Sequence, residues 1–554
     1  MKKKKVSAML LAAMVAASAL AGCGSGQTAQ TNESTAQQEA SVSEEPSQSE
    51  EASETAASES QEAGGEVVYP LKTDETLVYW GELNANVAAN FSSLGETEYG
   101  KQWQEQTGVT IEFQHPASGQ TNEQFNLMIA DGTYPDLWEY NWKNYPGGPG
   151  KAIDEGIILD LTDLINEYCP ALRAYLDENP DIDKEIQTED GRYYSFPMIR
   201  EVEAMCTSRG PMIRKDWLEE CGLEVPETVE EWHTVLTAFK DQMGATAPYT
   251  PSHGLIWSYA YGVGDEFRLE GDQVIYTAAT EDYKEYLKTM AAWWEEGLLD
   301  KDMFSGGDDL TSVKMTNGAS GATYMWVASG LQNVTLAARE EDPDYTLIAT
   351  KWPVLNKGEK PEYGYMESRY SYGGIAIGAS CKDPVLAAQV LDYEYTEAGS
   401  LLANFGVEGV SYTMVDGKPT MTEEVTNNPD GWNITQAWCK YAIAPANGAF
   451  IQSWDYQTQI LQIDEAREAL STWADTNAKE HLLPTLYIAD EDNDEYVSIM
   501  NEVQTYVSEM NAKFIMGTED VETGFDEYLN TLESMGLERA VEMRQAAYDR
   551  YLSR

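Results

Sequence analysis

Aromatic residues in loop-like and strand-end positions are the feature of this sequence that most directly suggests chemistry. The chain has 15 Trp and 33 Tyr. Those that stand outside helical stripes include Trp80, Trp138, Tyr140, Trp142, Tyr145, Trp257, Trp326, Tyr370, Tyr372 and Trp454. Sugars present apolar C–H faces that stack on aromatic rings, and hydroxyls that bind polar groups at the ring edge. Because these residues gather at the predicted carboxyl ends of strands, they favour a carbohydrate cleft, although core packing explains any single Trp equally well.

We therefore predict a ligand site of aromatic and polar side chains drawn from several segments. Its predicted members are Trp80, Asn84, Asp136, Tyr140, Trp142, Trp257, Trp326, Arg369, Tyr370 and Trp454. Trp326 ends the small-residue run 318–325, which should lead from a turn onto a strand that points at the cleft. The alternative for Trp326 is burial between that strand and a helix.

The sequence contains few motifs that indicate catalysis. The chain has no G-x-S-x-G elbow, no G-x-x-x-x-G-K-[ST] loop and no H-E-x-x-H. Its four histidines are scattered without ligand spacing, and among 94 Asp and Glu any two could be nominated as a glycosidase pair. We predict no catalytic residue, no metal site and no cofactor. A lipid-anchored glycoside hydrolase stays as an alternative.

The formal net charge of −58 restricts the partners of this protein. It excludes nucleic acid, whose phosphates require a basic surface, and it argues against docking flat on anionic lipid. We expect a neutral or weakly charged ligand whose affinity changes little with salt. An acidic ligand would instead need residues such as Arg200, Arg209 or Arg369.

The N-terminal residues have the pattern of an export signal. Four lysines at 2–5 precede an apolar run over 9–20, and Leu20-Ala-Gly-Cys23 follows. This end resembles the bacterial lipobox, in which the Cys is acylated and becomes the mature N-terminus, so residues 1–22 are predicted to be a signal peptide. From residue 24 to 66 there is no Lys or Arg, and residues 23–70 are predicted to be a disordered acidic stalk. We expect a body held at the extracellular face of the cell membrane by lipid on Cys23.

Five further cysteines remain, at positions 169, 206, 221, 381 and 439. Their odd number and the lack of any C-x-x-C spacing predict buried free thiols rather than a disulfide framework or a zinc site.

The order of elements predicts an α/β fold. Strands are expected at 76–80, 109–113 and 135–142, with helices at 100–107 and 121–130 between them, the rhythm of a parallel sheet with crossover helices. Residues 212–239 are expected to be helical, with a capping box formed by Thr228 and Glu231. A helix at 281–296, a turn that leads into a strand within 318–326, a strand at 375–377 and an almost wholly helical region after 460 complete the prediction.

Several segments together resemble one known family. They are the lipobox, the polar stalk, Gly132–Leu137, Ile213–Leu218 with Pro226–Val229, Asn404–Tyr412 with Asp416–Pro419, and Lys513–Gly517 with Gln545–Tyr551. This set is similar to the extracellular solute-binding proteins of ABC importers, family 1, in the large Gram-positive lipoprotein branch that includes alginate-binding proteins. Many relatives carry a calcium loop after the helix that begins at the Pro-Glu-Thr motif. Here residues 240–248 contain one acid and no alternating oxygen ligands, so calcium is not carried over.

The resemblance implies a two-lobed, type II periplasmic-binding-protein-like fold with a helical C-terminal section, which closes on its ligand by hinge bending. The expected division is 71–200 and 361–430 for lobe 1, 201–360 for lobe 2, and 431–554 for a helical section mostly on lobe 2. Crossings are expected at 196–204, 354–369 and 416–447. The implied function is capture of an oligosaccharide by a monomer and its delivery to ABC permease subunits, and in maltose-binding relatives a Trp like Trp326 stacks on the sugar. A peptide ligand is the other alternative. The sequence leaves the identity, length and linkage of the sugar open.

Overall fold

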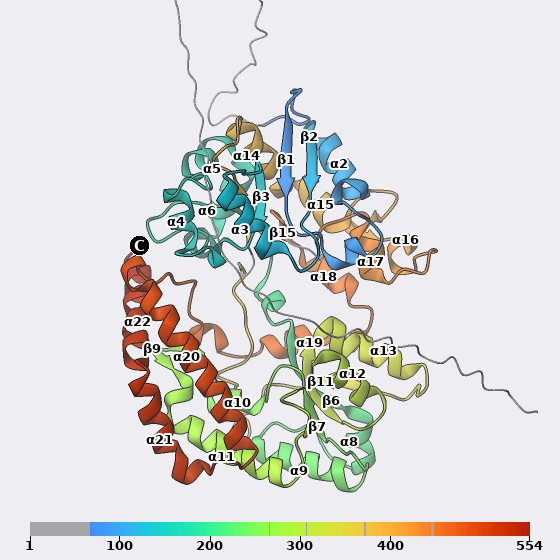
Figure 1. Ribbon diagram of the computed structural model, residues 1–554. Coiled ribbons are helices and arrows are strands. Elements are labelled where there is room, and N and C mark those ends of the chain that lie inside the picture. Colours follow the sequence, from blue (N-terminus) through green and yellow to red (C-terminus); the bar gives the residue numbers. More distant parts are fainter. Residues whose placement is uncertain (1–66, 265, 306, 371–372, 445–447) are drawn as a thin grey trace, which may run out of the picture. The chain divides into compact units, whose positions relative to one another are not determined.

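The computed structural model describes residues 67–264, 266–305, 307–370, 373–444 and 448–554 (Figure 1). The predicted signal peptide, Cys23 and nearly all of the predicted stalk lie outside these residues. The described chain forms two lobes, each with its own sheet. One hydrophobic cluster fills the first lobe and extends to residues of β6 (Arg209–Arg214), β10 (Ala322–Trp326), β11 (Leu347–Ala349) and α19 (Asp464–Ala474), and a second cluster lies within the second lobe.

The first lobe is built on a five-stranded sheet of order β2-β1-β3-β12-β4. Its strands are β1 (Thr76–Trp80), β2 (Thr110–Gln114), β3 (Leu137–Tyr140), β12 (Gly374–Ile377) and β4 (Phe196–Pro197). β1 pairs in parallel with β2 and β3, and β12 runs antiparallel to β3 and β4. The crossover helices are α2 (Glu98–Thr107) and α3 (Thr121–Asp131), and each ends at a glycine with positive φ. The predicted strand–helix–strand–helix–strand order is confirmed.

Further helices complete the first lobe. They are α1 (Ala85–Ala88), α4 (Gly148–Asp154), α5 (Thr162–Tyr168), α6 (Pro170–Glu178), α7 (Pro180–Glu185), α14 (Pro384–Asp392), α15 (Glu397–Phe405), α16 (Glu423–Thr426), α17 (Ile434–Cys439) and α18 (Trp454–Ile460). A hairpin of β13 (Tyr412–Val415) and β14 (Lys418–Met421) lies between α15 and α16 in the chain.

The second lobe has a four-stranded sheet of order β11-β6-β10-β7. Its strands are β6 (Arg209–Arg214), β7 (Tyr249–Pro251), β10 (Ala322–Trp326) and β11 (Leu347–Ala349), and its helices are α8 (Lys215–Cys221), α9 (Val229–Asp241), α10 (Trp257–Tyr261), α11 (Glu281–Glu295), α12 (Asp308–Thr316) and α13 (Asn333–Arg339). A separate hairpin joins β8 (Phe267–Glu270) and β9 (Gln273–Tyr276). The capping box predicted at Thr228 and Glu231 is present at the start of α9.

The segment 209–214 corrects one prediction. It forms strand β6 instead of the beginning of a helix. β6 is an inner strand of its sheet, between β11 and β10, and Gly210 to Arg214 are all buried. A strand that is buried on both faces shows no alternation of apolar and polar residues, so its sequence pattern cannot be told from that of a buried helix.

The C-terminal section is helical, as predicted, with α19 (Asp464–Ala474), α20 (Asp490–Ile515), α21 (Val521–Ser534) and α22 (Leu537–Ser553). Phe525, Tyr528 and Leu532 on the predicted apolar face of α21 are buried in the core of the second lobe. Helix α20 packs on α11 and α22. None of the helices in the described part of the chain is long and apolar enough to cross a membrane.

Three segments connect the lobes. β5 (Ile199–Arg200) follows the first-lobe sheet and pairs with β15 (Ile451–Gln452), and the second connection runs between β11 and β12. The third lies between α18 and α19, near residues 461–463, because α19 contacts β11 and β6. This is later than the predicted boundary at 430. In place of a wholly helical stretch, residues 431–460 contain α17, β15 and α18. The Trp438 indole donates to the Asn404 carbonyl of α15, and α18 contacts β14, so this segment packs on the first lobe. Helical pattern alone does not say which lobe a helix covers.

Candidate functional site

The most informative group of side chains lies where β10 ends and β6 begins. Trp326 is the last residue of β10, and in the antiparallel register it stands opposite Arg209, the first residue of β6. Residues opposite each other across two antiparallel strands point to the same face of the sheet and contact each other. The Arg209 guanidinium carbon lies 5.0 Å from the centre of the Trp326 ring, within the range of a cation–π interaction.

Two more rings join this pair. The Arg209 guanidinium lies 3.9 Å above the ring of Tyr365, and the rings of Trp326 and Tyr365 meet edge to face at 6.0 Å. His253, two residues beyond β7, places its ring 5.5 Å from that of Trp326. We call Arg209, His253, Trp326 and Tyr365 the Arg209 cluster. All four side chains are partly exposed, so they are available to a ligand.

A pocket adjoins this cluster in the second lobe. Its volume is about 170 Å³, and Arg209 and Tyr365 form part of its wall. The other side chains of the wall include Tyr259, Glu266, Phe267, Arg268, Tyr363 and His481. The Arg268 guanidinium lies 4.4 Å above the Tyr363 ring, which in turn lies 4.4 Å from the His481 ring. Aromatic rings interleaved with donors are the composition of a site that binds polar rings such as sugars.

The first lobe offers Tyr140, the last residue of β3. Its ring stacks on Phe125 with a centre-to-centre distance of 3.8 Å, and its hydroxyl donates to Asn122 Oδ1 at 3.1 Å. Tyr140 is partly exposed. Trp80 and Trp142, which were predicted beside it, are instead at most 3% exposed and contact Phe125 and Trp138. They pack in the interior against Phe125, on which Tyr140 stacks, and are not exposed to a ligand.

Three predicted residues lie in or beside the connecting segments. Arg369 is occupied by internal hydrogen bonds, from Nε to the Arg200 carbonyl at 2.8 Å and from Nη2 to the Tyr175 hydroxyl at 2.6 Å. Tyr370 is fully buried, and its hydroxyl lies 2.9 Å from that of Tyr194. Trp454 is partly exposed and starts α18.

The remaining predicted residues lie elsewhere. Trp257 is completely buried among Trp232, Tyr249 and Trp293, so its indole belongs to the second-lobe core. Asp136 precedes β3, at the end opposite Tyr140, and its carboxylate accepts from the Val78 backbone N–H at 2.8 Å. Asn84 caps α1 through its side-chain oxygen. Tyr372, one of the aromatic residues first considered, is outside the described residues.

Sequence reasoning missed the pairing of Arg209 with Trp326 and the wall formed by Tyr363, Tyr365, Arg268 and His481. The pairing depends on the register of two strands more than a hundred residues apart, which no local pattern encodes. The density of tyrosines in residues 363–372 was a usable signal for the wall.

Three described carboxyl groups have raised pKa values, and none of them belongs to the pocket wall. Burial raises the pKa of Glu185, Asp392 and Glu394, and Asp392 and Glu394 belong to α14 and the turn that follows it in the first-lobe interior. A glycosidase needs such a carboxyl in its cleft as the general acid. These three groups are therefore explained by burial in the fold.

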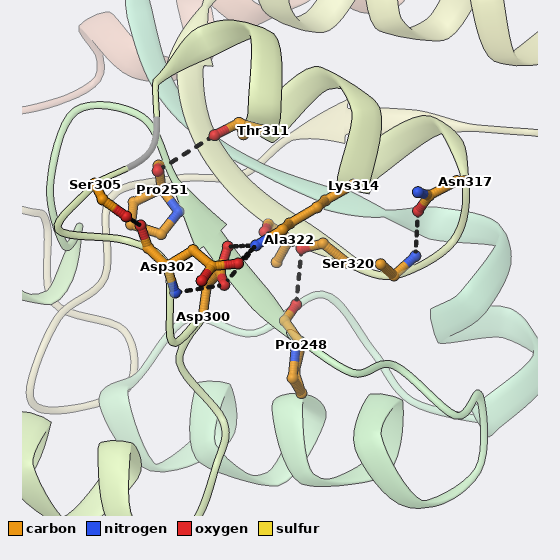
Figure 2. A network of polar contacts seen from close by, with 11 residues as sticks. Pro248, Pro251, Asp300, Asp302, Ser305, Thr311, Lys314, Asn317, Ser320 and Ala322 are labelled. Atoms are coloured by element: carbon orange, nitrogen blue, oxygen red, sulfur yellow. Dashed lines mark hydrogen bonds and ion pairs between the residues drawn. The ribbon is translucent and has the colours of Figure 1, made fainter.

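The carboxylates of Asp300 and Asp302 are paired with a lysine within the second lobe (Figure 2). Lys314 on α12 donates to both oxygens of Asp300 at 2.7 Å and to Asp302 Oδ2 at 2.8 Å. Asp302 N also donates to Asp300 Oδ1 at 3.0 Å. No group of three or more His, Cys, Asp or Glu side chains is arranged to hold a metal ion within the described ranges. The five cysteines that the structure describes are free thiols, and only Cys221 is partly exposed.

Comparison with known proteins places these features in context. The family model for bacterial extracellular solute-binding proteins matches residues 88–400. The chain is 25% identical over 548 residues to the fructooligosaccharide ABC transporter substrate-binding protein FusA of Streptococcus pneumoniae serotype 4, covering 90% of this chain and 94% of that protein. It is 23% identical over 455 residues to lipoprotein LipO of Bacillus subtilis, covering 78% of this chain and 84% of that protein.

Solved structures give the same fold. The alginate-binding protein AlgQ2, solved without calcium ion, matches with a TM-score of 0.68 and 25% identity, covering 86% of this chain and 99% of that chain. FusA of S. pneumoniae in complex with kestose matches with a TM-score of 0.66 and 21% identity over 86% of this chain and all of that chain (100%).

Proposed function

The chain belongs to the family of bacterial extracellular solute-binding proteins, and from this premise we propose that it captures an oligosaccharide and delivers it to an ABC permease. The observation that carries the sugar assignment is the Arg209 cluster, in which a partly exposed indole stands beside a guanidinium and a tyrosine ring at the end of a sheet. An indole face binds the C–H face of a pyranose, and the neighbouring donors bind its hydroxyls. The names of the matched relatives, FusA and AlgQ2, support a carbohydrate ligand.

In this proposal Trp326 is the stacking platform, and Arg209 and Tyr365 orient the sugar. Tyr140 and Trp454 are the partly exposed aromatic residues of the predicted set on the first-lobe side. Trp142 contacts the Tyr140 ring, and Trp80 contacts Phe125, on which Tyr140 stacks. Arg369 and Tyr370 hold the connecting segments together. Asn84 stays in the proposal as a polar residue that follows β1 and is partly exposed.

The proposal includes no catalysis. The protein acts as a lipid-anchored monomer at the extracellular face of the membrane, held through Cys23, and releases its ligand to permease subunits. The relative LipO, a lipoprotein by name, supports the anchor. Hinge bending at the three connecting segments would bring the two lobes onto the ligand.

Calorimetric titration of the body from residue 67 onward with a panel of oligosaccharides tests the proposal. We expect saturable 1:1 binding of at least one oligosaccharide, with the ligand recovered intact after prolonged incubation. Release of shorter sugars would establish a hydrolase instead. Binding of a peptide library with no response to any sugar would establish a peptide-binding component.

A further inference from the structure

Arg209 has an unusual environment for a cation in this protein. The chain carries 94 Asp and Glu against 36 Lys and Arg, so a carboxylate partner is easy to supply. Yet no carboxylate or other hydrogen-bond acceptor contacts the Arg209 guanidinium among the residues that the structure describes. Its Nε is buried without a partner, and aromatic rings supply its surroundings. A buried, unmatched donor on a charged group costs free energy, which an incoming acceptor would recover.

The two other arginines that the sequence offered for an acidic ligand, Arg200 and Arg369, are occupied. Arg200 is almost fully buried and forms an ion pair with Glu367 at 2.5 Å. Arg369 donates to the carbonyls of Arg200 and Glu201 and to the hydroxyl of Tyr175. Of the three arginines considered for an acidic ligand, Arg209 alone keeps its donors available.

The pocket beside Arg209 contains two arginines in a strongly acidic chain. Its wall includes Arg209 and Arg268, and Glu266 is its single carboxylate among the described residues. His481, also in the wall, lies 3.6 Å from Glu362. Glu270 pairs with Arg268 from a position that is 51% exposed, outside the wall. Its volume is about 170 Å³, well above the roughly 10–15 Å³ that a single water needs.

We propose that this pocket binds the carboxylate of a sugar acid, with Arg209 as the residue that recognises the negative charge. The inference rests on the proposed function and adds to it that the oligosaccharide carries at least one acidic residue, such as a uronic or sialic acid, in place of the neutral ligand that the net charge alone predicts. The indole of Trp326 stacks on the neighbouring sugar, because Arg209 contacts both the indole and the pocket.

The physical reason for this arrangement is selectivity in a strongly acidic protein. The overall charge of −58 repels an anionic ligand, so only a local cation with no internal counter-ion can hold one. The rings of Tyr365 and Trp326 fix the guanidinium plane without using its hydrogen-bond donors. The donors are therefore oriented before the ligand arrives, which lowers the entropy cost of binding.

The test compares acids with their own methyl esters, which have nearly the same shape and no charge. Trigalacturonate and 3′-sialyllactose are titrated into the body, each alongside its methyl ester and a panel of neutral oligosaccharides. We expect at least one acid to bind about 10- to 100-fold more tightly than its ester, as for a charge-assisted hydrogen bond. Raising NaCl from low to high concentration should weaken the binding of the acid and leave the affinity for the ester unchanged.

Variants then assign the effect to Arg209. Arg209→Met should reduce the preference for the acid to less than about threefold, whereas Arg209→Lys should retain part of it. Lys215→Met is the matched control, because it removes one positive charge from an exposed face of α8. It should leave the acid-to-ester ratio unchanged. Circular dichroism and the melting temperature establish that each variant is folded before its titration.

The failures of the two proposals are distinguishable. Binding of neutral sugars or esters with affinity equal to that of the acids, or an unchanged ratio in folded Arg209→Met, would overturn the sugar-acid inference and leave the proposed function intact. A panel in which neither acids, esters nor neutral oligosaccharides bind would overturn both.

Discussion

At the scale of single residues, exposure separates two roles for the tryptophans. Trp326 is partly exposed at the end of β10, whereas Trp257 is 0% exposed. We expect Trp326→Ala to weaken oligosaccharide binding by about 1–3 kcal/mol, by analogy with stacking of bases on aromatic rings, while the melting temperature of the free protein changes little. Calorimetry and thermal unfolding of the same preparation measure both quantities.

Trp257→Ala is the matched contrast. Removing a fully buried Trp should lower the free energy of unfolding by about 3–5 kcal/mol, with normal ligand affinity for the fraction that remains folded. If Trp326→Ala were the variant that melts early and binds normally, Trp326 would have to be removed from the site.

Asp392 predicts a pH dependence of stability. Its carboxyl is buried beside the start of α6 and accepts from the backbone N–H of Leu172 at 2.8 Å, and burial raises its pKa from 3.8 to about 6. Because the folded protein holds this proton more tightly than the unfolded chain does, the contribution is stabilising at low pH and is lost as the pH rises through 6. We expect the stability of the wild type relative to Asp392→Asn to fall by about 1 kcal/mol between pH 5 and pH 7. Urea unfolding at several pH values measures it, and a constant difference would contradict it.

Residue types and positions made part of the site predictable. Trp326 and Tyr140 could be found because each ends a recognisable strand and neither falls in a helical stripe. Trp257 could not be told from them, because its sequence context suggests a loop, yet it begins α10 and is completely buried beside Trp232 and Trp293. Burial of a side chain is decided by elements distant in sequence, and a single sequence does not record their arrangement.

At the scale of elements, one ion pair fixes α12. Lys314 on this helix binds Asp300, which directly follows the segment paired with Tyr249, and the side chains are 14% and 4% exposed (Figure 2). Burial lowers the pKa of Lys314, but hydrogen bonds to Asp300 and Asp302 outweigh this and raise it. We expect Lys314→Met to lower the free energy of unfolding by about 3 kcal/mol, because it leaves the buried Asp300 without a counter-charge. Chemical denaturation measures the loss.

The double variant Asp300→Asn, Lys314→Met is the control for this prediction. It removes the isolated charge as well as its partner, and so it should be clearly more stable than Lys314→Met alone. Equal losses in the two variants would mean that the methylene chain of Lys314, and not its charge, holds the helix.

Elements were predictable where local chemistry determines them. The bounds of β1, the glycine that ends α2 and the capping box of α9 follow from residues within a few positions of one another. β6 was not predictable, because its continuous apolar run becomes a strand only through pairing with β10 and β11. The third connection was misplaced for the same kind of reason. Helices α17 and α18 have ordinary helical patterns, and only packing assigns them to the first lobe.

At the scale of the whole molecule, the acidic charge affects how the protein can be held at a membrane. The net charge of −58 keeps the body away from anionic lipid, and residues 24–66 contain no Lys or Arg that could bind the membrane surface. We propose that attachment comes from a covalent lipid, for which the sequence provides a candidate position, Cys23 after Leu20-Ala-Gly.

Lipidation of Cys23 can be tested directly on the chain with its N-terminal segment. Metabolic labelling with a fatty-acid analogue should mark the wild type, and the labelled protein should sediment with membranes. Cys23→Ser removes the thiol that carries the diacylglycerol, so it should abolish labelling and shift the protein to the soluble fraction. Cys221→Ser is the matched control, because Cys221 is the one partly exposed thiol among the described cysteines and its loss should leave labelling unchanged. Equal labelling of wild type and Cys23→Ser would contradict the anchor. The acidic body would then need another means of staying near its permease, because an apolar chain is the one membrane attachment that its charge does not oppose.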